Sequence, residues 1–178
     1  KGEESRSQLE PSDTEKTKRN RIAVLQEKSL SFRMGQTGAS YEKLFAAYLE
    51  KANEITIEDP YIRAPWQIRN FVEFATMLVD TRPVDDLKLT LITNEEEEKL
   101  PDLIDRLDDI KDDLAGYGIT FEYKFRDFHD RCIRTDTGWT ITLGRGLDIF
   151  EKYNPYSVAA SRQEKRKCKE FIITYNKE

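Results

Sequence analysis

The sequence has a single histidine, His129, and only two cysteines, Cys132 and Cys168. The cysteines do not have CxxC spacing and no second histidine accompanies them, so a zinc site is not expected. Two cysteines do not suggest a disulfide framework either, and reduced thiols in a cytosolic protein are the simplest interpretation. We therefore expect neither a metal nor any other cofactor.

Long apolar runs are also missing. None approaches the roughly 20 residues that a membrane-spanning helix needs, and no hydrophobic signal region follows the first residue. These absences predict a protein without a transmembrane segment, located in the cytoplasm, with peripheral attachment to a membrane as an alternative. Because the chain begins with Lys1 rather than Met, we expect it to be part of a longer protein.

An excess of basic charge is absent as well. The chain has 29 Lys and Arg against 34 Asp and Glu, a net charge of -5. This balance excludes a basic coat over the whole surface of the kind that many nucleic-acid-binding domains carry. A polyanion would have to be bound by a local basic patch.

Apolar and aromatic residues suffice for a core, with nine Phe, eight Tyr and two Trp among 178 residues, so one domain with an extension is expected. Residues 1–20 contain one Leu and no aromatic, which is typical of a linker. Residues 21–30 are expected to form a short helical arm. We therefore divide the chain into a flexible or helical N-terminal extension, 1–37, and a compact domain, 38–178.

Hydrophobic periodicity within the compact domain predicts three helices and six strands. The helices alternate with strands at first, and strands then follow one another, which predicts the α/β class with a mixed sheet flanked by helices. The expected helices cover 41–52, 65–80 and the acidic segment 94–118, and the expected strands cover 54–59, 87–93, 119–125, 131–135, 139–144 and 171–175.

Two helices carry more detailed expectations. Ser40 is placed to cap the first helix through its side-chain oxygen, without a full capping box. The second helix starts at Pro65, and its periodicity predicts one buried face. The residues of that face are Ile68, Phe71, Val72, Ala75 and Leu78.

The only histidine belongs to the spacing His129-x-Arg131-x-x-x-x-Asp136. In a strand His129 and Arg131 would share one face, with Cys132 turned the other way, and the turn at Asp136 would bring the carboxylate toward the same region. An imidazole can attack phosphorus or hold a proton, a guanidinium grips two phosphate oxygens, and a carboxylate can orient an imidazole. A lone histidine beside charged residues on an exposed strand is also compatible with no chemical role.

Two further segments suggest an anion site. "GRGLD" combines a flexible backbone with Arg145 and Asp148, and "EDPYIR" places Asp59, Tyr61 and Arg63 just past a strand. With Arg131, these arginines predict a shared phosphate-sized site, supported by Asp59, Tyr61 and Asp148. The alternative is that Arg63 and Arg145 pair with Asp59 and Asp148 and tie loops together.

Three stretches resemble a known family: "SYEKLFAAYLEKANEITIEDPYIRAPWQIRNF", "HDRCIRTDTGW" and "LGRGLDIF" are similar to the phospholipase-D-like C-terminal domain of MIT-domain proteins. The resemblance runs from about Gly38 to the C-terminus. In the eukaryotic branch such domains are dimeric modules that bind acidic membranes. The tail "RQEKRKCKEFIITY" looks closer to the bacterial branch, where similar domains end larger proteins, including Lon-type ATP-dependent proteases of BREX-like phage-defence islands.

The resemblance also implies roles for the motif, because the wider superfamily carries a His-x-Lys-x-x-x-x-Asp signature. His129 would be the nucleophile that forms a phosphohistidine, Arg131 would bind the nonbridging oxygens, and Asp136 would orient or support the site. Arg131 stands where the signature has Lys, and a rigid fork in place of a point charge puts the geometry for attack in doubt. The reaction needs two histidines and this chain has one, so catalysis requires a homodimer with a His129 from each subunit.

Three functional hypotheses follow. The first, which we favour, is a dimeric phospholipase-D-like module that binds phosphate groups of acidic lipids or of a nucleic-acid backbone through Arg63, Arg131 and Arg145. The second is a metal-independent phosphodiesterase or nuclease that works through His129. The third is an appendage that dimerises a larger ATPase or protease. The basic segment 162–169 could extend the patch, or it could be the solvated face of a helix.

Overall fold

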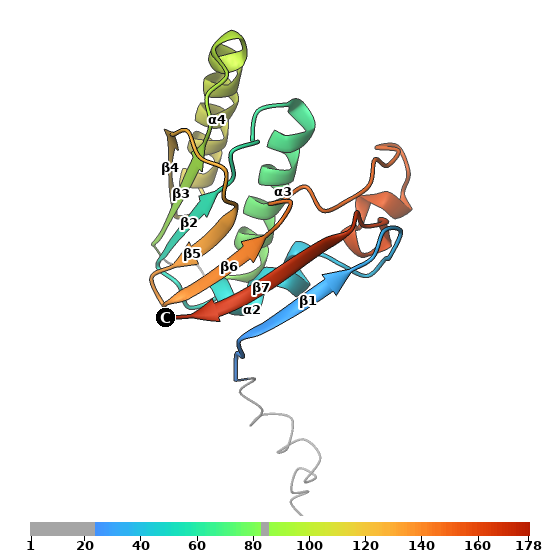
Figure 1. Ribbon diagram of the computed structural model, residues 1–178. Coiled ribbons are helices and arrows are strands. Elements are labelled where there is room, and N and C mark those ends of the chain that lie inside the picture. Colours follow the sequence, from blue (N-terminus) through green and yellow to red (C-terminus); the bar gives the residue numbers. More distant parts are fainter. Residues whose placement is uncertain (1–23, 83–85) are drawn as a thin grey trace, which may run out of the picture.

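The computed structural model describes residues 24–82 and 86–178. Its strands form one seven-stranded mixed sheet in the order β1-β7-β6-β5-β2-β3-β4 (Figure 1). β2, β3 and β4 run parallel to one another, and every other neighbouring pair is antiparallel. The strands are β1 (Lys28–Phe32), β2 (Glu54–Glu58), β3 (Leu87–Thr93), β4 (Ile119–Phe125), β5 (Cys132–Thr135), β6 (Trp139–Leu143) and β7 (Phe171–Lys177).

The longer helices, α3 (Pro65–Thr81) and α4 (Leu100–Ala115), lie on one face of the sheet (Figure 1). They connect the parallel strands, as expected because parallel neighbours need a crossover. A π-helical segment, η1 (Glu42–Ala46), continues into α2 (Ala47–Leu49). Short 3₁₀ turns complete the fold: η2 (Glu97–Lys99), η3 (Ala159–Ser161) and η4 (Gln163–Lys165). No helix within the described ranges is both long and apolar enough to cross a membrane.

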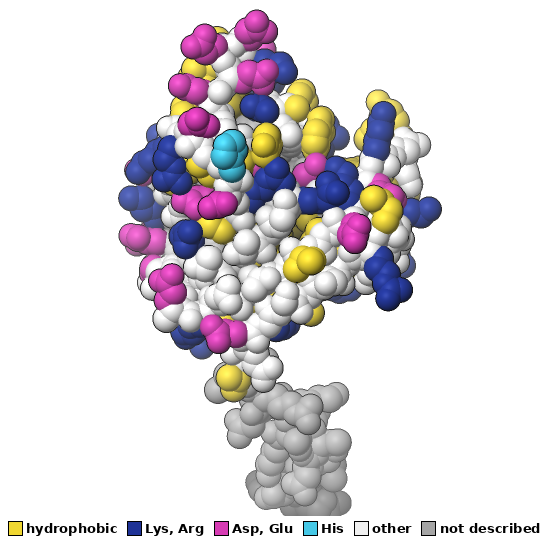
Figure 2. Space-filling view, viewed as in Figure 1, with side chains coloured by type: hydrophobic (Ala, Val, Ile, Leu, Met, Phe, Trp, Pro, Cys, Tyr) yellow, Lys and Arg dark blue, Asp and Glu magenta, His cyan; other side chains and the backbone are white. Residues whose placement is uncertain are grey.

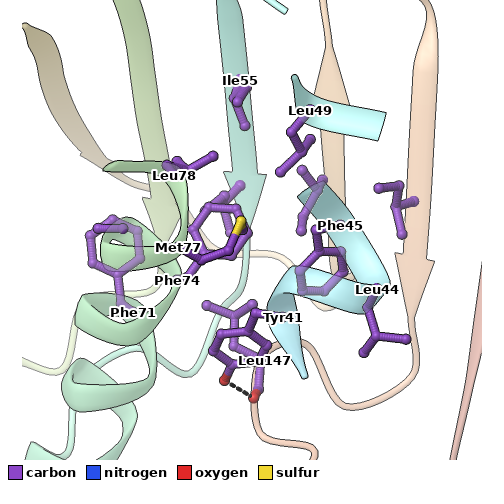
Figure 3. Close-up of a cluster of buried hydrophobic side chains, with 14 of the residues drawn as sticks. Tyr41, Leu44, Phe45, Leu49, Ile55, Phe71, Phe74, Met77, Leu78 and Leu147 are labelled. Carbon is purple, nitrogen blue, oxygen red and sulfur yellow. Dashed lines mark hydrogen bonds between the residues drawn. The ribbon is translucent and has the colours of Figure 1, made fainter. Parts of the chain in front are cut away.

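The core is built from alternate residues of every central strand. Ile57 of β2 lies in register with Leu91 of β3 and Ile133 of β5, and all three are buried. The helices cover this row: Phe45 of η1 and Phe74 of α3 meet edge to face with ring centroids 5.6 Å apart (Figure 3). One contiguous cluster of this kind supplies most of the favourable free energy of folding.

The opposite face of the sheet is polar. Thr142 of β6 pairs with Cys132 of β5 and Thr174 of β7, and Ile172 is the large hydrophobic residue that this face exposes, at 57%. In Figure 2, viewed as in Figure 1, uncharged polar side chains and backbone form a broad white area over β5, β6 and β7. Antiparallel sheets commonly present such a face to water.

The α/β class and the mixed sheet are confirmed, and a strand or helix occurs in each segment where one was expected. Ser40 caps the first helical turn as predicted, because its Oγ accepts a hydrogen bond from the backbone N–H of Lys43 at 3.1 Å. The buried face of α3 is largely confirmed, but Val72 was placed wrongly and is 40% exposed. Phe71 and Ala75 fill the inward positions on either side of it.

The helical arm expected over 21–30 is wrong for Lys28–Leu30, which belong to β1. β1 pairs along its whole length with β7, and Phe32 stacks on Phe171 with ring centroids 4.5 Å apart. The local sequence did not show this because the partner strand lies at the other end of the chain. The sheet thus includes residues before the boundary predicted at 37 and 38. The linker expected at 1–20 lies outside the described residues.

The basic segment 162–169 does not form the face of an α-helix, and part of it is buried. It contains the 3₁₀ turn η4, and Arg166 within it is buried and pairs with Glu73 of α3. Cys168 is buried and Lys169 pairs with Asp148. The helix-face alternative is therefore wrong. The contribution of the exposed Arg162, Lys165 and Lys167 to a basic patch stays a prediction.

Candidate functional site

A small open pocket of about 110 Å³ lies beyond the carboxyl end of β2. β5 runs antiparallel to β2 and β6 runs antiparallel to β5, so the start of β5 and the end of β6 meet the end of β2 there. The first turns of α3 complete the wall. The lining residues are Asp59, Tyr61, Ile62, Gln67, Asn70, Arg131, Arg145 and Asp148.

Asp59 is a buried residue of the pocket lining that connects two loops. It is 3% exposed, and its two carboxylate oxygens accept hydrogen bonds from the backbone N–H of Tyr61 at 3.0 Å and of Leu147 at 3.3 Å. Burial raises the pKa of Asp59, while these two N–H groups and the nearby Arg131 guanidinium act in the opposite direction. With both oxygens engaged by backbone, Asp59 acts by fixing two loops rather than by contacting a ligand.

Gly146 allows the turn after β6 to approach this carboxylate. Its φ is 59°, in the left-handed region that favours glycine. A Cβ at this position would overlap the carboxylate of Asp59 and press on Cδ of Arg131. The glycine of "GRGLD" is therefore needed for close packing against Asp59, and the turn carries Arg145 to the pocket.

The two pocket arginines are held by backbone carbonyls. Arg131 is half-buried, donates from Nη1 to the carbonyl of Gly144 at 2.9 Å, and stacks over Tyr61 with its guanidinium carbon 4.5 Å from the ring centroid. Arg145 is exposed and donates from Nε to the carbonyl of Glu170 at 2.7 Å. Each guanidinium keeps further N–H groups that can donate to an anion.

Gln67 and Asn70, which the sequence analysis did not select, also line the pocket. Gln67 and Asn70 come from the first two turns of α3, and Lys169 pairs with the lining residue Asp148 at 2.7 Å. The start of α3 at Pro65 was predictable, and polar residues in its first turns could have been assigned to a site at the end of β2. The Lys169–Asp148 pair had no local signal, since the segments that carry the two residues are separated in sequence.

Arg63 was expected in the same site, but it does not line the pocket. It pairs with Glu96 at 3.3 Å and approaches the Tyr61 ring at 5.3 Å. The alternative expectation, that Arg63 pairs with Asp59 and Arg145 with Asp148, is also wrong. Asp59 is engaged by backbone, and Asp148 pairs with Lys169 instead.

His129 lies in the loop before β5 rather than in a strand. It is exposed and does not line the pocket, and in Figure 2 the cyan histidine is at the surface with Lys and Arg side chains nearby. The loop is held by Asn94, whose side chain donates to the carbonyl of Phe128 at 3.3 Å and accepts from its N–H at 3.2 Å. The sequence analysis did not identify Asn94.

Asp136 lies at the opposite end of β5 from Arg131. Four strand residues separate the two, which corresponds to about 16 Å along an extended chain. Its Oδ1 accepts a hydrogen bond from the backbone N–H of Asn53 at 3.0 Å, just before β2. The expectation that the hairpin would gather His129, Arg131 and Asp136 in one place is therefore wrong, because a strand extends their spacing instead of closing it.

A second polar cluster surrounds Glu58 on the open face of the sheet. Glu58 accepts hydrogen bonds from the thiol of Cys132 and from Arg126, both at 3.0 Å, and lies 3.6 Å from Arg134. Burial and the neighbouring Glu58 carboxylate raise the pKa of Cys132 to about 12, so its thiol stays protonated at neutral pH. In the part of the chain that the structure describes, no group of three or more His, Cys, Asp or Glu residues could hold a metal ion.

Comparison with known proteins places this chain in a family. The family described as "Phospholipase D-like domain at C-terminus of MIT" matches residues 38–177. The mouse protein "MIT domain-containing protein 1" is 37% identical over 150 residues, which cover 82% of this chain. The match spans 60% of the length of that curated relative.

Among solved structures, the phospholipase D family member Nuc from Salmonella typhimurium is similar at a TM-score of 0.45 and 14% identity, over 85% of each chain. The phosphatidylserine synthase of Haemophilus influenzae is similar at a TM-score of 0.47 and 12% identity, over 88% of this chain and 36% of the other. At these values nothing about activity follows from either likeness.

Proposed function

The chain belongs to the family of phospholipase D-like domains at the C-terminus of MIT proteins, and we propose that it is a dimeric module that binds anionic phosphate groups within a larger protein. The observation that carries this proposal is the pocket that Arg131 and Arg145 share beyond the end of β2. Two guanidinium groups at one small pocket match the size and charge of a phosphoryl group.

The pocket also lies at the N-terminal end of α3. A helix of this length presents partial positive charge at its first turn, which favours a bound anion. The arginines are held in place by Gly144, Glu170 and the Tyr61 ring before any ligand binds. Such preorganisation lowers the entropy that binding would otherwise lose.

A second candidate function is phosphodiester cleavage through a phosphohistidine on His129. The exposed position of His129 supports it, since the imidazole is accessible to a substrate and to a second subunit. Three features favour binding instead. His129 does not line the pocket, Asp136 lies at the other end of β5, and Arg131 takes the place of the lysine of the superfamily signature.

Dimerisation is part of the proposal because this chain has one histidine and the two-step reaction of the superfamily uses two. A homodimer would also double the number of anion sites and increase avidity for a surface with repeated phosphates. A two-fold interface in which the two His129 loops approach each other fits both functions. The alternative to both functions is a domain that has no ligand and only dimerises a larger ATPase or protease.

The ligand and setting are further parts of the proposal. A cytoplasmic module at the end of a larger protein, as in the Lon-type proteases of the bacterial branch that the C-terminal tail of this chain resembles, could bind a nucleic-acid backbone. A module like those of the eukaryotic branch would bind acidic lipids at a membrane.

Binding of labelled DNA, labelled RNA and anionic vesicles in EDTA tests these functions. We expect salt-sensitive binding that Arg131→Ala and Arg145→Ala weaken and that Arg69→Ala, an exposed arginine of α3 outside the pocket, leaves unchanged. Cleavage that His129→Ala abolishes would instead establish the enzyme. A protein that dimerises but binds none of these anions would support the third hypothesis, a domain that only dimerises a larger ATPase or protease.

A further inference from the structure

We infer that the pocket recognises the phosphate ester of a short polyol, such as a glycerol phosphate group, rather than phosphate alone. This inference rests on the proposed function, and it names the chemical class of ligand for the same pocket. The residues that line the pocket fall into two chemically different sets. One set offers guanidinium groups to an anion, and the other offers acceptors and amides that suit hydroxyl groups.

The anion-binding set consists of Arg131 and Arg145. Each uses one nitrogen for a backbone carbonyl, Arg131 through Nη1 and Arg145 through Nε. Guanidinium has five N–H donors, so most of each group stays available for phosphoryl oxygens. Inorganic phosphate would engage these two arginines and leave the remaining polar groups of the pocket to water.

The other set consists of Gln67, Asn70 and Asp148. Gln67 uses Oε1 to accept from the backbone N–H of Arg63 and Ala64, at 3.2 and 2.9 Å. Among the residues that the structure describes, no hydrogen bond engages its Nε2 or the side-chain amide of Asn70. Asp148 uses Oδ2 for Lys169, which leaves its other oxygen for a hydroxyl donor.

A hydroxyl both donates and accepts, so it can satisfy an amide N–H and a carboxylate oxygen together. An ammonium group would fit the Asp148 carboxylate and the Asn70 amide oxygen, but it would leave the Nε2 donor of Gln67 without an acceptor. A plain alkyl group would cover all of these polar atoms without a hydrogen bond, at a cost in free energy. The set of Gln67, Asn70 and Asp148 therefore favours a ligand with hydroxyl groups next to its phosphate.

The size of the pocket limits the polyol. Its volume of about 110 Å³ is well below the roughly 300–1,000 Å³ of pockets that enclose drug-sized ligands. A phosphoryl group with a chain of a few carbon atoms fits, and a whole nucleotide does not. Free glycerol 3-phosphate and the headgroup of phosphatidylglycerol both have this chemistry.

Calorimetric titration of the full chain with glycerol 3-phosphate, propyl phosphate and inorganic phosphate tests the inference. Propyl phosphate has the same carbon chain without the hydroxyl groups. We expect glycerol 3-phosphate to bind about tenfold more tightly than propyl phosphate, the effect of one or two net hydrogen bonds. Asn70→Ala and Asp148→Asn should each reduce the ratio of the glycerol 3-phosphate and propyl phosphate affinities. Asn176→Ala, an exposed asparagine of β7, should leave that ratio and the affinity for inorganic phosphate unchanged.

Different results would contradict the preference for a polyol ester and the binding of phosphate itself. Equal affinity for glycerol 3-phosphate and propyl phosphate, with inorganic phosphate still bound, would overturn the polyol inference and leave phosphate binding intact. Loss of all three ligands would overturn the proposed function itself. Phosphatidylcholine vesicles that contain phosphatidylglycerol or an equal share of phosphatidic acid then identify the source. Preference for phosphatidylglycerol assigns the lipid headgroup, and a preference confined to the soluble ester assigns the free ligand.

Discussion

Arg166 and Glu73 form a two-pronged ion pair between the chain before β7 and helix α3. The Nη2–Oε1 distance is 2.7 Å and the Nη1–Oε2 distance is 2.9 Å. The arginine is 4% exposed and also stacks over Tyr153, with its guanidinium carbon 4.1 Å from the ring centroid. Because Asn70 lies one turn before Glu73 on α3, this pair also fixes the helix that forms one wall of the pocket.

Replacing Arg166 by alanine should destabilise the domain. The change leaves Glu73 without its charged partner, although Nε2 of Gln163 still donates to it at 3.2 Å. Removal of one member of a largely buried pair typically costs about 3–5 kcal/mol. Since the Glu73 side chain is 25% exposed and water can solvate it in part, we expect a loss of about 2–4 kcal/mol. Urea denaturation of the wild type and the variant measures this loss in the free energy of unfolding. Lys167→Ala, an exposed neighbour, should change the free energy of unfolding by less than about 0.5 kcal/mol. Equal stability of the two variants would contradict the prediction.

Gly146→Ala should damage both stability and phosphate binding. The positive φ costs a non-glycine residue about 1–2 kcal/mol, and the new Cβ must displace the Asp59 carboxylate or Arg131. We expect a total loss of about 2–4 kcal/mol in unfolding free energy and weaker binding of inorganic phosphate. Gly144→Ala is the matched control, since a Cβ there meets nothing within 4 Å. If both alanine variants behave like the wild type, the close packing of this turn is not required.

The buried Asp59 predicts a specific pH dependence of stability. Burial raises its pKa in the folded state above the ordinary value of 3.8, so the folded state binds this proton more tightly than the unfolded state does. The resulting stabilisation is complete below pH 3.8 and is lost as pH rises through the raised pKa. The difference in unfolding free energy between wild type and Asp59→Asn should therefore shift in favour of the wild type as pH falls through this window. A difference that is independent of pH would show that the carboxyl group titrates as in the unfolded chain.

Both thiols should be unreactive in the folded protein. Burial and Glu58 raise the pKa of Cys132 to about 12, and burial also raises the pKa of Cys168. The thiolate is the reactive form, so a disulfide reagent at pH 8 should label neither cysteine in native protein and both in denaturant. Rapid labelling of one thiol under native conditions would mean that its surroundings open readily. A Glu58→Gln variant then tests whether the carboxylate contributes, since its removal should lower the pKa of Cys132.

Local sequence patterns predicted much of the fold. Alternation in "LKLTLIT" and "WTITLG" and the periodicity of the segment after Pro65 identified β3, β6 and α3, because side-chain burial follows the period of each element. β1 was missed. Its five residues have no strong pattern, and they become a strand by pairing with β7, near the other end of the chain.

The sequence by itself also determined which residue types could bind an anion, and it selected five of the eight residues that line the pocket: Asp59, Tyr61, Arg131, Arg145 and Asp148. Only the tertiary structure decided which of the selected residues meet. β5 lies antiparallel to β2, so Arg131 arrives at the end of β2 beside Asp59, whereas Asp136 is carried to its start. The spacing of residues along the chain determines which side chains one strand and its flanking loops carry. The direction of the strand in the sheet decides at which end of the sheet each of these side chains lies.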